Sequence, residues 1–172
     1  MTVIFETSSE LMFAPRLALF GALAALAAAS DYDYFAHELV GKTLDEMLYR
    51  EQGQYSSDEG LLTAEWPPNR TDITKFIQGK AALFLMLPGA FIPTKPANMM
   101  TDYLAKLGEL AKLGVTDLIV VCVNDAAVMQ AWQNTFSVPK DSGVNVHWMA
   151  DWSGSFSHTL GLAIVPPGRD NE

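Results

Sequence analysis

The sequence predicts an α/β fold in which helices cover a parallel sheet. Three apolar runs of strand length, at residues 81–87, 118–123 and 144–149, alternate with segments of helical periodicity. A strand that is apolar at nearly every position is typical of a parallel sheet buried on both faces. The order strand, helix, strand, helix, strand then implies right-handed crossovers between neighbouring strands.

The two helices between these strands are predicted from apolar spacing and from start and stop signals. Pro96 suits the first turn of the first helix, and Gly114 supplies its stop. Asn124 or Asp125 caps the second helix, which runs to about Phe136. The apolar positions that repeat at helical spacing in the first helix are Met100, Tyr103, Leu104, Leu107, Leu110 and Ala111.

The length and the apolar content predict one domain with an N-terminal appendage. The 172 residues are 49% hydrophobic, which suffices for one core but not for two ordinary domains. We expect a hydrophobic segment over residues 1–30, a polar connector with one helix over 31–70, and the main domain over 71–172.

Charge and cysteine content exclude several classes of function. Twenty acidic and eleven basic residues give a net charge of -9, so nucleic acid is not an expected partner. The single cysteine, Cys122, excludes a disulfide within the chain and any dithiol motif. His37, His147 and His158 lack the spacing of a metal site, and we predict neither a metal nor another cofactor.

The apolar stretch at residues 17–29 leaves three alternatives open. Its length is typical of the hydrophobic core of a cleaved targeting peptide. Extended back to Leu11, it becomes a marginal membrane span, and the third alternative is a buried helix. We favour a targeting, anchoring or docking role at a membrane. The candidate interaction residues are Leu17, Phe20, Gly21, Leu23, Trp148 and Trp152.

A series of motifs is similar to one known family. Residues 88–95 (PGAFIPTK) follow the central strand and resemble the peroxiredoxin active-site loop of the subfamily that includes the plant type II enzymes. Further matches occur in the same order along the chain: Gly79-Lys80, Val123-Asn124-Asp125-Ala126 with Trp132, Ala150-Asp151, and Leu160-Gly161-Leu162. The resemblance covers about residues 71–162 and implies a thioredoxin-like fold of the peroxiredoxin type.

The same comparison of motifs shows three departures from the family. Lys95 stands where the family carries its peroxide-attacking cysteine, and Ile92 stands where it carries a threonine. Pro88 alone of the three loop positions is kept. The family continues beyond the last matched segment into further strands that bear an arginine, so we expect a C-terminally truncated sheet. The resemblance therefore implies a degenerate site at Pro88, Ile92 and Lys95, with no catalytic residue.

These features together predict a non-catalytic accessory subunit of a membrane-associated complex. By analogy the complex is photosynthetic or respiratory, lies in a plastid or mitochondrion, and supplies other protein subunits as partners. We expect a neighbouring subunit, in preference to the strand-like residues 2–5, to cover the free edge of the sheet. Two alternatives remain: a thiol-dependent peroxidase or redox sensor that uses Cys122, and a module that binds a small ligand beside Ile92 and Lys95.

Overall fold

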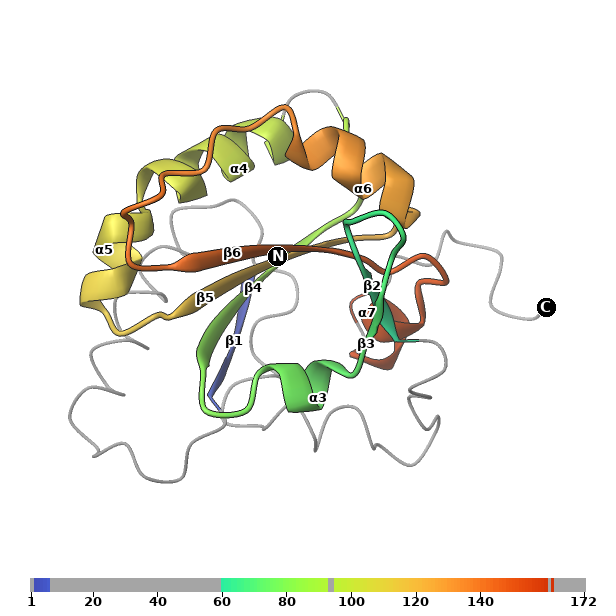
Figure 1. Cartoon of the computed structure of the whole chain (residues 1–172), viewed down its shortest axis with the longest axis horizontal. Coiled ribbons are helices and arrows are strands. Elements are labelled where there is room, and N and C mark those ends of the chain that lie inside the picture. Colours follow the sequence, from blue (N-terminus) through green and yellow to red (C-terminus); the bar gives the residue numbers. More distant parts are fainter. Residues whose placement is uncertain (1, 7–59, 93–94, 161, 163–172) are drawn as a thin grey trace.

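The computed structural model describes residues 2–6, 60–92, 95–160 and 162 (Figure 1). In chain order the elements are β1 (Thr2–Glu6), β2 (Leu61–Thr63), β3 (Arg70–Thr71), α3 (Ile73–Phe76), β4 (Ala81–Leu87), α4 (Lys95–Ala105), α5 (Leu107–Lys112), β5 (Asp117–Cys122), α6 (Ala126–Gln133), β6 (Asn145–Ala150) and α7 (Ser155–Thr159).

The described strands form one sheet in the order β1-β4-β5-β6-β2-β3. The three central strands β4, β5 and β6 are parallel, while β1 pairs with β4 and β2 pairs with β6 in the antiparallel direction. The central strands begin and end within one residue of the apolar runs in the sequence. The predicted α/β fold with a parallel sheet is confirmed.

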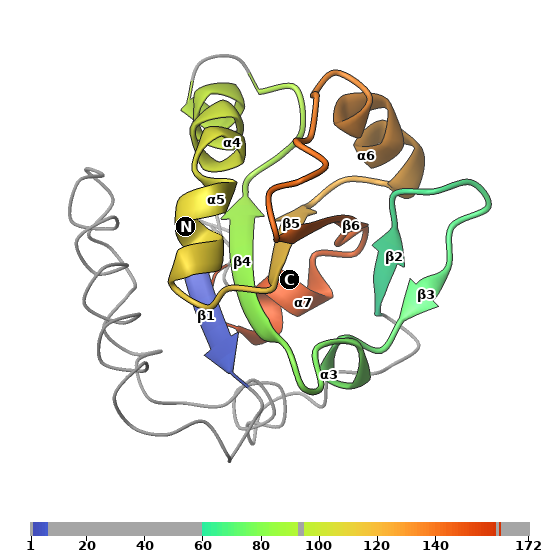
Figure 2. The same ribbon diagram turned by 60° about the vertical axis from the view of Figure 1, so that its left-hand side comes forward.

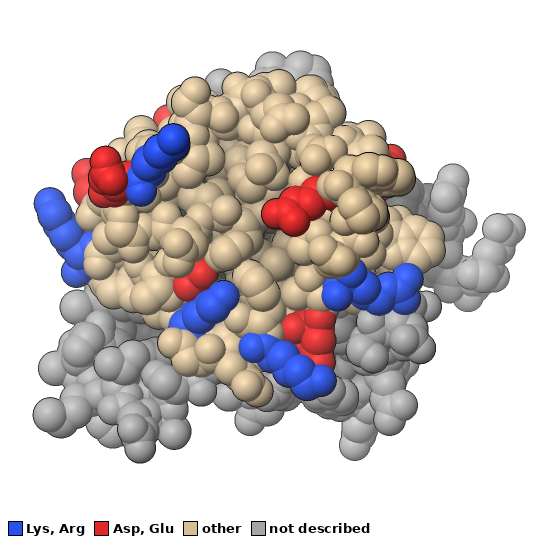
Figure 3. Space-filling model, in the orientation of Figure 1, with Lys and Arg blue, Asp and Glu red and all other residues tan. Residues whose placement is uncertain are grey.

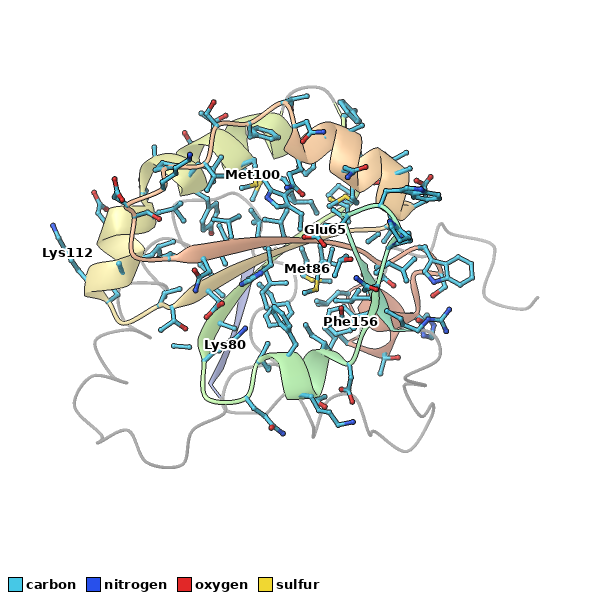
Figure 4. All side chains as sticks on the ribbon, in the orientation of Figure 1. Glu65, Lys80, Met86, Met100, Lys112 and Phe156 are labelled. Carbon is cyan, nitrogen blue, oxygen red and sulfur yellow. The ribbon has the colours of Figure 1, made fainter. Side chains whose placement is uncertain are left out.

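Helices lie on both faces of this sheet, which explains why the central strands are apolar over most of their length. Helices α4, α5 and α6 cover one face, and α3 and α7 lie on the other (Figures 1 and 2). Along β4 the side chains of Leu83 and Leu85 join the core cluster under α4 and α6, whereas Phe84 and Met86 join the cluster on the α7 side. Figure 4 shows Met100 between α4 and the sheet, with Met86 and Phe156 on the opposite face.

The segment predicted as one helix from Pro96 to Gly114 is two helices. Helix α4 ends at Ala105 and α5 begins at Leu107, with Lys106 between them at φ -103° and ψ 8°. The apolar periodicity continues across the break because Leu107 and Leu110 of α5 pack into the same cluster as Met100 and Leu104 of α4. Spacing alone therefore did not reveal where the axis changes direction.

The edges of the sheet differ from the expectation in two places. Strand β1 pairs with β4 over Thr2–Leu85 to Glu6–Ala81, so residues of this chain cover that edge of β4, where we preferred a neighbouring subunit. Strands β2 and β3 extend the sheet into residues 61–71, most of which we assigned to the connector. The apolar stretch 17–29 and the connector helix at residues 39–49 lie outside the described residues. Among the residues that are described, no helix has the length and hydropathy needed to cross a membrane.

Candidate active site

The parallel strands place the residues of interest at one edge of the sheet. Leu87, Cys122 and Ala150 are the last residues of β4, β5 and β6, and the strand register sets Leu87 opposite Cys122 and Cys122 opposite Ala150. In open parallel sheets the carboxyl ends of the strands are the usual location of functional sites. The loops that follow these three strands therefore define the candidate site.

The loop after β4, residues 88–92, is held by close contacts. A Cβ on Gly89 would lie 3.1 Å from Ile92 Cδ1 and 3.5 Å from Asn124 Oδ1, so a larger residue there would require a small shift of the Ile92 side chain. The backbone N–H of Ala90 donates a hydrogen bond of 2.7 Å to Asn124 Oδ1. Phe91 adopts φ 57°, a left-handed conformation that is costly for a bulky residue, and its ring is exposed.

The thiol of Cys122 lies beneath this edge, fully buried in the apolar cluster under α4 and α6. Burial raises the pKa of the thiol to about 12, so it is protonated at neutral pH in this conformation. The carbonyl oxygen of Cys122 accepts hydrogen bonds of 2.9 Å from the backbone N–H of both Asn124 and Asp151. These bonds join the loop after β5 to the loop after β6.

The buried carboxylate of Asp151 organises the third loop. Its Oδ1 accepts a hydrogen bond from the Phe156 N–H at 3.2 Å, and its Oδ2 accepts one from the Ser157 N–H at 2.8 Å. Both bonds satisfy backbone donors in the first turn of α7, which otherwise lack partners within the helix. Asp151 therefore fixes α7 to the end of β6. In the sequence, Asp151 matches a family motif, and no role follows from that match alone.

Exposed apolar side chains follow the ends of the same three strands. Their exposed fractions lie between 40% and 54%, which is high for large apolar groups, and they are Phe91, Ile92, Val123 and Trp152. Val123 follows β5, while Trp152 lies two residues beyond β6. The edge that carries the buried thiol thus also carries four exposed apolar side chains.

The residues that we predicted as a degenerate site follow the end of β4 and reach the start of α4. Pro88 and Ile92 lie in the loop after β4, both exposed, and Lys95 is the first residue of α4. The side chain of Lys95 lies outside what the structure describes, so the degenerate site and the small-ligand alternative remain predictions. Leu17, Phe20, Gly21 and Leu23 also lie outside the described residues.

The two tryptophans proposed as interaction residues have different environments. Trp152 is exposed, as an interaction residue requires. Trp148 is buried and packs edge-on against Trp132 at 5.5 Å between ring centroids, so its assignment as a surface residue is wrong. The alternation of β6 turns Trp148 toward α6, where aromatic rings stack in the core.

A second polar cluster, which the sequence analysis missed, lies at the opposite end of β5. The buried Asp117 carboxylate accepts a hydrogen bond from the Thr116 hydroxyl at 2.7 Å, and Nε2 of His147 lies 2.7 Å from its Oδ1. Nζ of Lys80 lies 3.5 Å from the same oxygen and 3.7 Å above the Phe76 ring. We had treated His147 as an ordinary polar residue, since no local motif links it to Asp117, 30 positions earlier.

Two opposing effects act on the pKa of Asp117 in this cluster. Burial raises the pKa of Asp117, but the hydrogen bonds from Thr116 and His147 and the charge of Lys80 outweigh that effect and hold the pKa below its ordinary value. Figure 4 shows Lys80 near the start of β4, far from the carboxyl edge. On the face shown in Figure 3, charged side chains of both signs are interspersed among the described residues.

Within the described ranges, no group of three or more His, Cys, Asp and Glu side chains is arranged to hold a metal ion. The polar groups at the carboxyl edge bond to backbone atoms of this chain, as Asn124 does to Ala90 and Asp151 does to α7. The chemically reactive group that this edge offers is the Cys122 thiol.

A mixed sheet with three parallel central strands, antiparallel neighbours and helices on both faces fits the thioredoxin-like class of α/β proteins. The particular family follows from comparison with known proteins: the model of the family described as Redoxin matches residues 52–171, and the chain belongs to that family. The resemblance to peroxiredoxins stated from the motifs is thereby confirmed.

Several of the relatives that match are named peroxiredoxins, and Prx3 of Vibrio vulnificus is among the solved structures. Peroxiredoxin-2D of Arabidopsis thaliana is 36% identical over 86 residues, which cover 50% of this chain and 51% of the relative. Peroxiredoxin-2E, chloroplastic, of the same plant is 33% identical over 94 residues, covering 54% of this chain and 38% of the relative. Reduced Prx3 of Vibrio vulnificus in complex with hydrogen peroxide is 26% identical with a TM-score of 0.50, covering 65% of this chain and 66% of that one. The chain spans about half the length of the first curated relatives it matches.

These matches contradict two expectations from the sequence: that the chain is a non-catalytic accessory subunit of a membrane complex, and that it is not an enzyme. Relatives named as peroxiredoxins support the thiol-dependent alternative instead. The expectation rested on Lys95, which stands where the family carries its peroxide-attacking cysteine. A thiol still ends the neighbouring strand, opposite Leu87 and at the same edge as the loop. A photosynthetic or respiratory complex likewise finds no support in these matches.

Proposed function

We propose that this chain carries out thiol-dependent chemistry on peroxides, as a peroxidase or as a redox sensor, with Cys122 as the reacting thiol. Its membership of the redoxin family and its peroxiredoxin relatives support this proposal. The observation that carries it is the place of Cys122, the single cysteine of the sequence, at the carboxyl edge directly opposite the residue before the Pro88 loop.

The reaction requires the thiolate form of Cys122. The sulfur attacks one oxygen of a hydroperoxide, an S–O bond forms as the O–O bond breaks, and the departing oxygen takes a proton to leave as water or an alcohol. The sulfur is oxidised to sulfenic acid and the peroxide is reduced. Two molecules of a small thiol then restore Cys122: the first forms a mixed disulfide and releases water, and the second releases the free thiol and a small-molecule disulfide.

Burial determines how fast this reaction proceeds. With a pKa of about 12, roughly one thiol in 10⁵ is ionised at pH 7 in the closed conformation. The buried thiol therefore reacts slowly with peroxide, and the reaction depends on exposure of Cys122 to solvent at the carboxyl edge. Slow, exposure-dependent oxidation suits a sensor of sustained peroxide better than it suits a rapid scavenger.

The test is direct trapping of sulfenic acid. The full chain is treated with hydrogen peroxide and dimedone, and the intact mass and the modified residue are determined by mass spectrometry. We expect one dimedone adduct at Cys122, formed in proportion to peroxide, and none in Cys122→Ser. Turnover of peroxide in the presence of a small thiol distinguishes a peroxidase from a sensor that is only oxidised. An unmodified Cys122 after prolonged exposure to peroxide in the folded protein would overturn the proposal.

We also propose an organelle as the location, since one relative is named chloroplastic. Placement in a plastid is the specific form of this proposal, and attachment to a membrane through residues 17–29 is a separate prediction about residues outside the described part. Imaging of the chain fused at its C-terminus to a fluorescent protein tests it. A diffuse cytosolic signal would contradict it.

A further inference from the structure

We infer that Asn124 is a positioning residue that controls access to Cys122 by holding the Pro88–Ile92 loop against the end of β5. This inference deepens the proposed function and rests on it for its biological meaning. The motif at residues 123–126 matched the family in sequence, yet neither the fold nor the proposed chemistry assigns a role to the Asn124 side chain.

The geometry joins Asn124 to both sides of the edge. Its side-chain oxygen accepts the 2.7 Å hydrogen bond from the Ala90 N–H, and its backbone N–H donates a 2.9 Å bond to the Cys122 carbonyl. Asn124 therefore links the loop after β4 to the residue that carries the thiol. The link spans 34 positions in sequence and is partly buried, where a hydrogen bond is less exposed to competing water.

The loop also packs against the apolar cluster to which the thiol belongs. Ala90 packs against the same apolar cluster as Cys122, on the face covered by α4 and α6. Moving Ala90 outward breaks its bond to Asn124 and uncovers that side of the cluster. The backbone position of the loop thus decides whether water and peroxide reach the sulfur.

Two features indicate that the Pro88–Ile92 loop is only weakly held in its closed conformation. Phe91, next to Ala90, holds a left-handed φ of 57° that a bulky residue adopts only when neighbouring contacts impose it. The rings and methyl groups at this turn, Phe91 and Ile92, are exposed, so they contribute little burial to the closed state. The hydrogen bond from the Ala90 N–H to Asn124 is made one residue before Phe91. It offsets the cost of the strained Phe91 backbone and so keeps the loop in this conformation.

The experiment compares the rate of Cys122 alkylation by iodoacetamide in folded protein at fixed pH. Asn124→Ala removes the acceptor, and we expect alkylation about three- to tenfold faster, the range expected for loss of one hydrogen bond. Asn124→Asp keeps an acceptor oxygen in place and should restore a rate close to that of the unmodified protein. Peroxide oxidation trapped with dimedone should change in the same order across the three proteins.

A matched control separates local opening from general loss of stability. Asp72→Ala removes another side-chain acceptor, which caps α3 on the opposite face of the sheet, and should leave the alkylation rate unchanged. Equal rates in Asn124→Ala and the unmodified protein, or equal acceleration in Asp72→Ala, would overturn the inference. Faster alkylation in Asn124→Ala without any sulfenic acid would leave the role of Asn124 intact and refute the proposed function instead.

Discussion

The two ends of β5 place an ionisable side chain in the core under opposite conditions. Asp117 begins the strand and Cys122 ends it, and both are almost completely buried. Asp117 is surrounded by a hydroxyl, an imidazole and an ammonium group, so its charged form is stabilised. Cys122 lies among apolar side chains, and its neutral form is stabilised.

The difference shows that burial alone does not set the charge of a group in this fold. At the amino end, hydrogen bonds and an ion pair overcome the cost of removing the carboxylate from water. At the carboxyl end, no such compensation lowers the pKa of the Cys122 thiol. In the proposed function, the thiol therefore reacts only when the loops at this end of the sheet expose it to solvent. A rigid polar anchor and an edge that can open thus occupy the two ends of one strand.

The largest effect is expected at alkaline pH. The Cys122 thiol has an ordinary pKa of 9.0 and a folded-state pKa of about 12, so the unfolded chain loses its proton first as the pH rises. The free energy of unfolding should therefore fall above pH 9 by about 1.4 kcal/mol per pH unit from this group. The free energy of unfolding is measured in urea for the natural protein and for Cys122→Ala at pH 8 to 10.5. The difference between the two pH dependences is the contribution of the Cys122 thiol. Parallel curves for the two proteins would contradict a buried neutral thiol.

Removal of the Asp117 carboxylate should have an effect of similar size. Asp117→Ala leaves Thr116, Lys80 and His147 without their shared acceptor, and we expect a loss of about 2–3 kcal/mol in the free energy of unfolding. Chemical denaturation of both proteins at pH 7 measures this loss in the free energy of unfolding. Asp102→Ala, at an exposed position of α4, should change stability by less than about 0.5 kcal/mol.

Unfolding at acidic pH tests the charge of the same carboxylate, with a variant that keeps the shape of the side chain. Because the folded-state pKa of Asp117 is lowered, its contribution is present above its ordinary pKa of 3.8 and is lost as the pH falls through the folded-state value. Thermal unfolding between pH 6 and pH 2 should show a steeper loss for the natural protein than for Asp117→Asn. Identical slopes would show that Asp117 titrates as it does in the unfolded chain.

The smallest effect concerns the strained turn at the carboxyl edge. Phe91→Gly and Phe91→Ala remove the same exposed ring, but only glycine adopts a φ of 57° without steric cost. We expect the glycine variant to be more stable than the alanine variant by about 1 kcal/mol in equilibrium unfolding. An alanine variant of equal or greater stability would mean that the turn is not strained.

The sequence predicts much of this fold because its strands are apolar on both faces. The run at 81–87 matches β4 residue for residue, and Asp125, one of the two residues predicted as the cap, caps α6 by accepting a hydrogen bond from the Val128 N–H. The break at Lys106 and the pairing of β1 with β4 could not be predicted in the same way. The first is hidden by continuous apolar spacing, and the second depends on residues about 80 positions apart.

The candidate site was harder to predict than the fold. A family motif identified the Pro88 loop. Because the family carries its cysteine at the position of Lys95, the predicted site centred on Lys95 and did not include the Cys122 thiol on the next strand. The cluster around Asp117 joins Lys80, Thr116 and His147 from three separate segments, and no local pattern links them. Asn124 could be quoted as a match, yet its bond to Ala90 depends on how two loops meet after the sheet forms.

The pairing of β1 with β4 has a consequence for the order of folding. Leu83 and Leu118 pair across 35 positions and Leu118 and Val146 across 28, whereas Thr2 and Leu85 pair across 83. Closing the longest loop costs the most chain entropy, so the central strands should assemble first and β1 should add last. During that interval the edge of β4, apolar over its whole length, is open to pairing with another chain. Aggregation during refolding should therefore depend on protein concentration even though the finished sheet covers this edge.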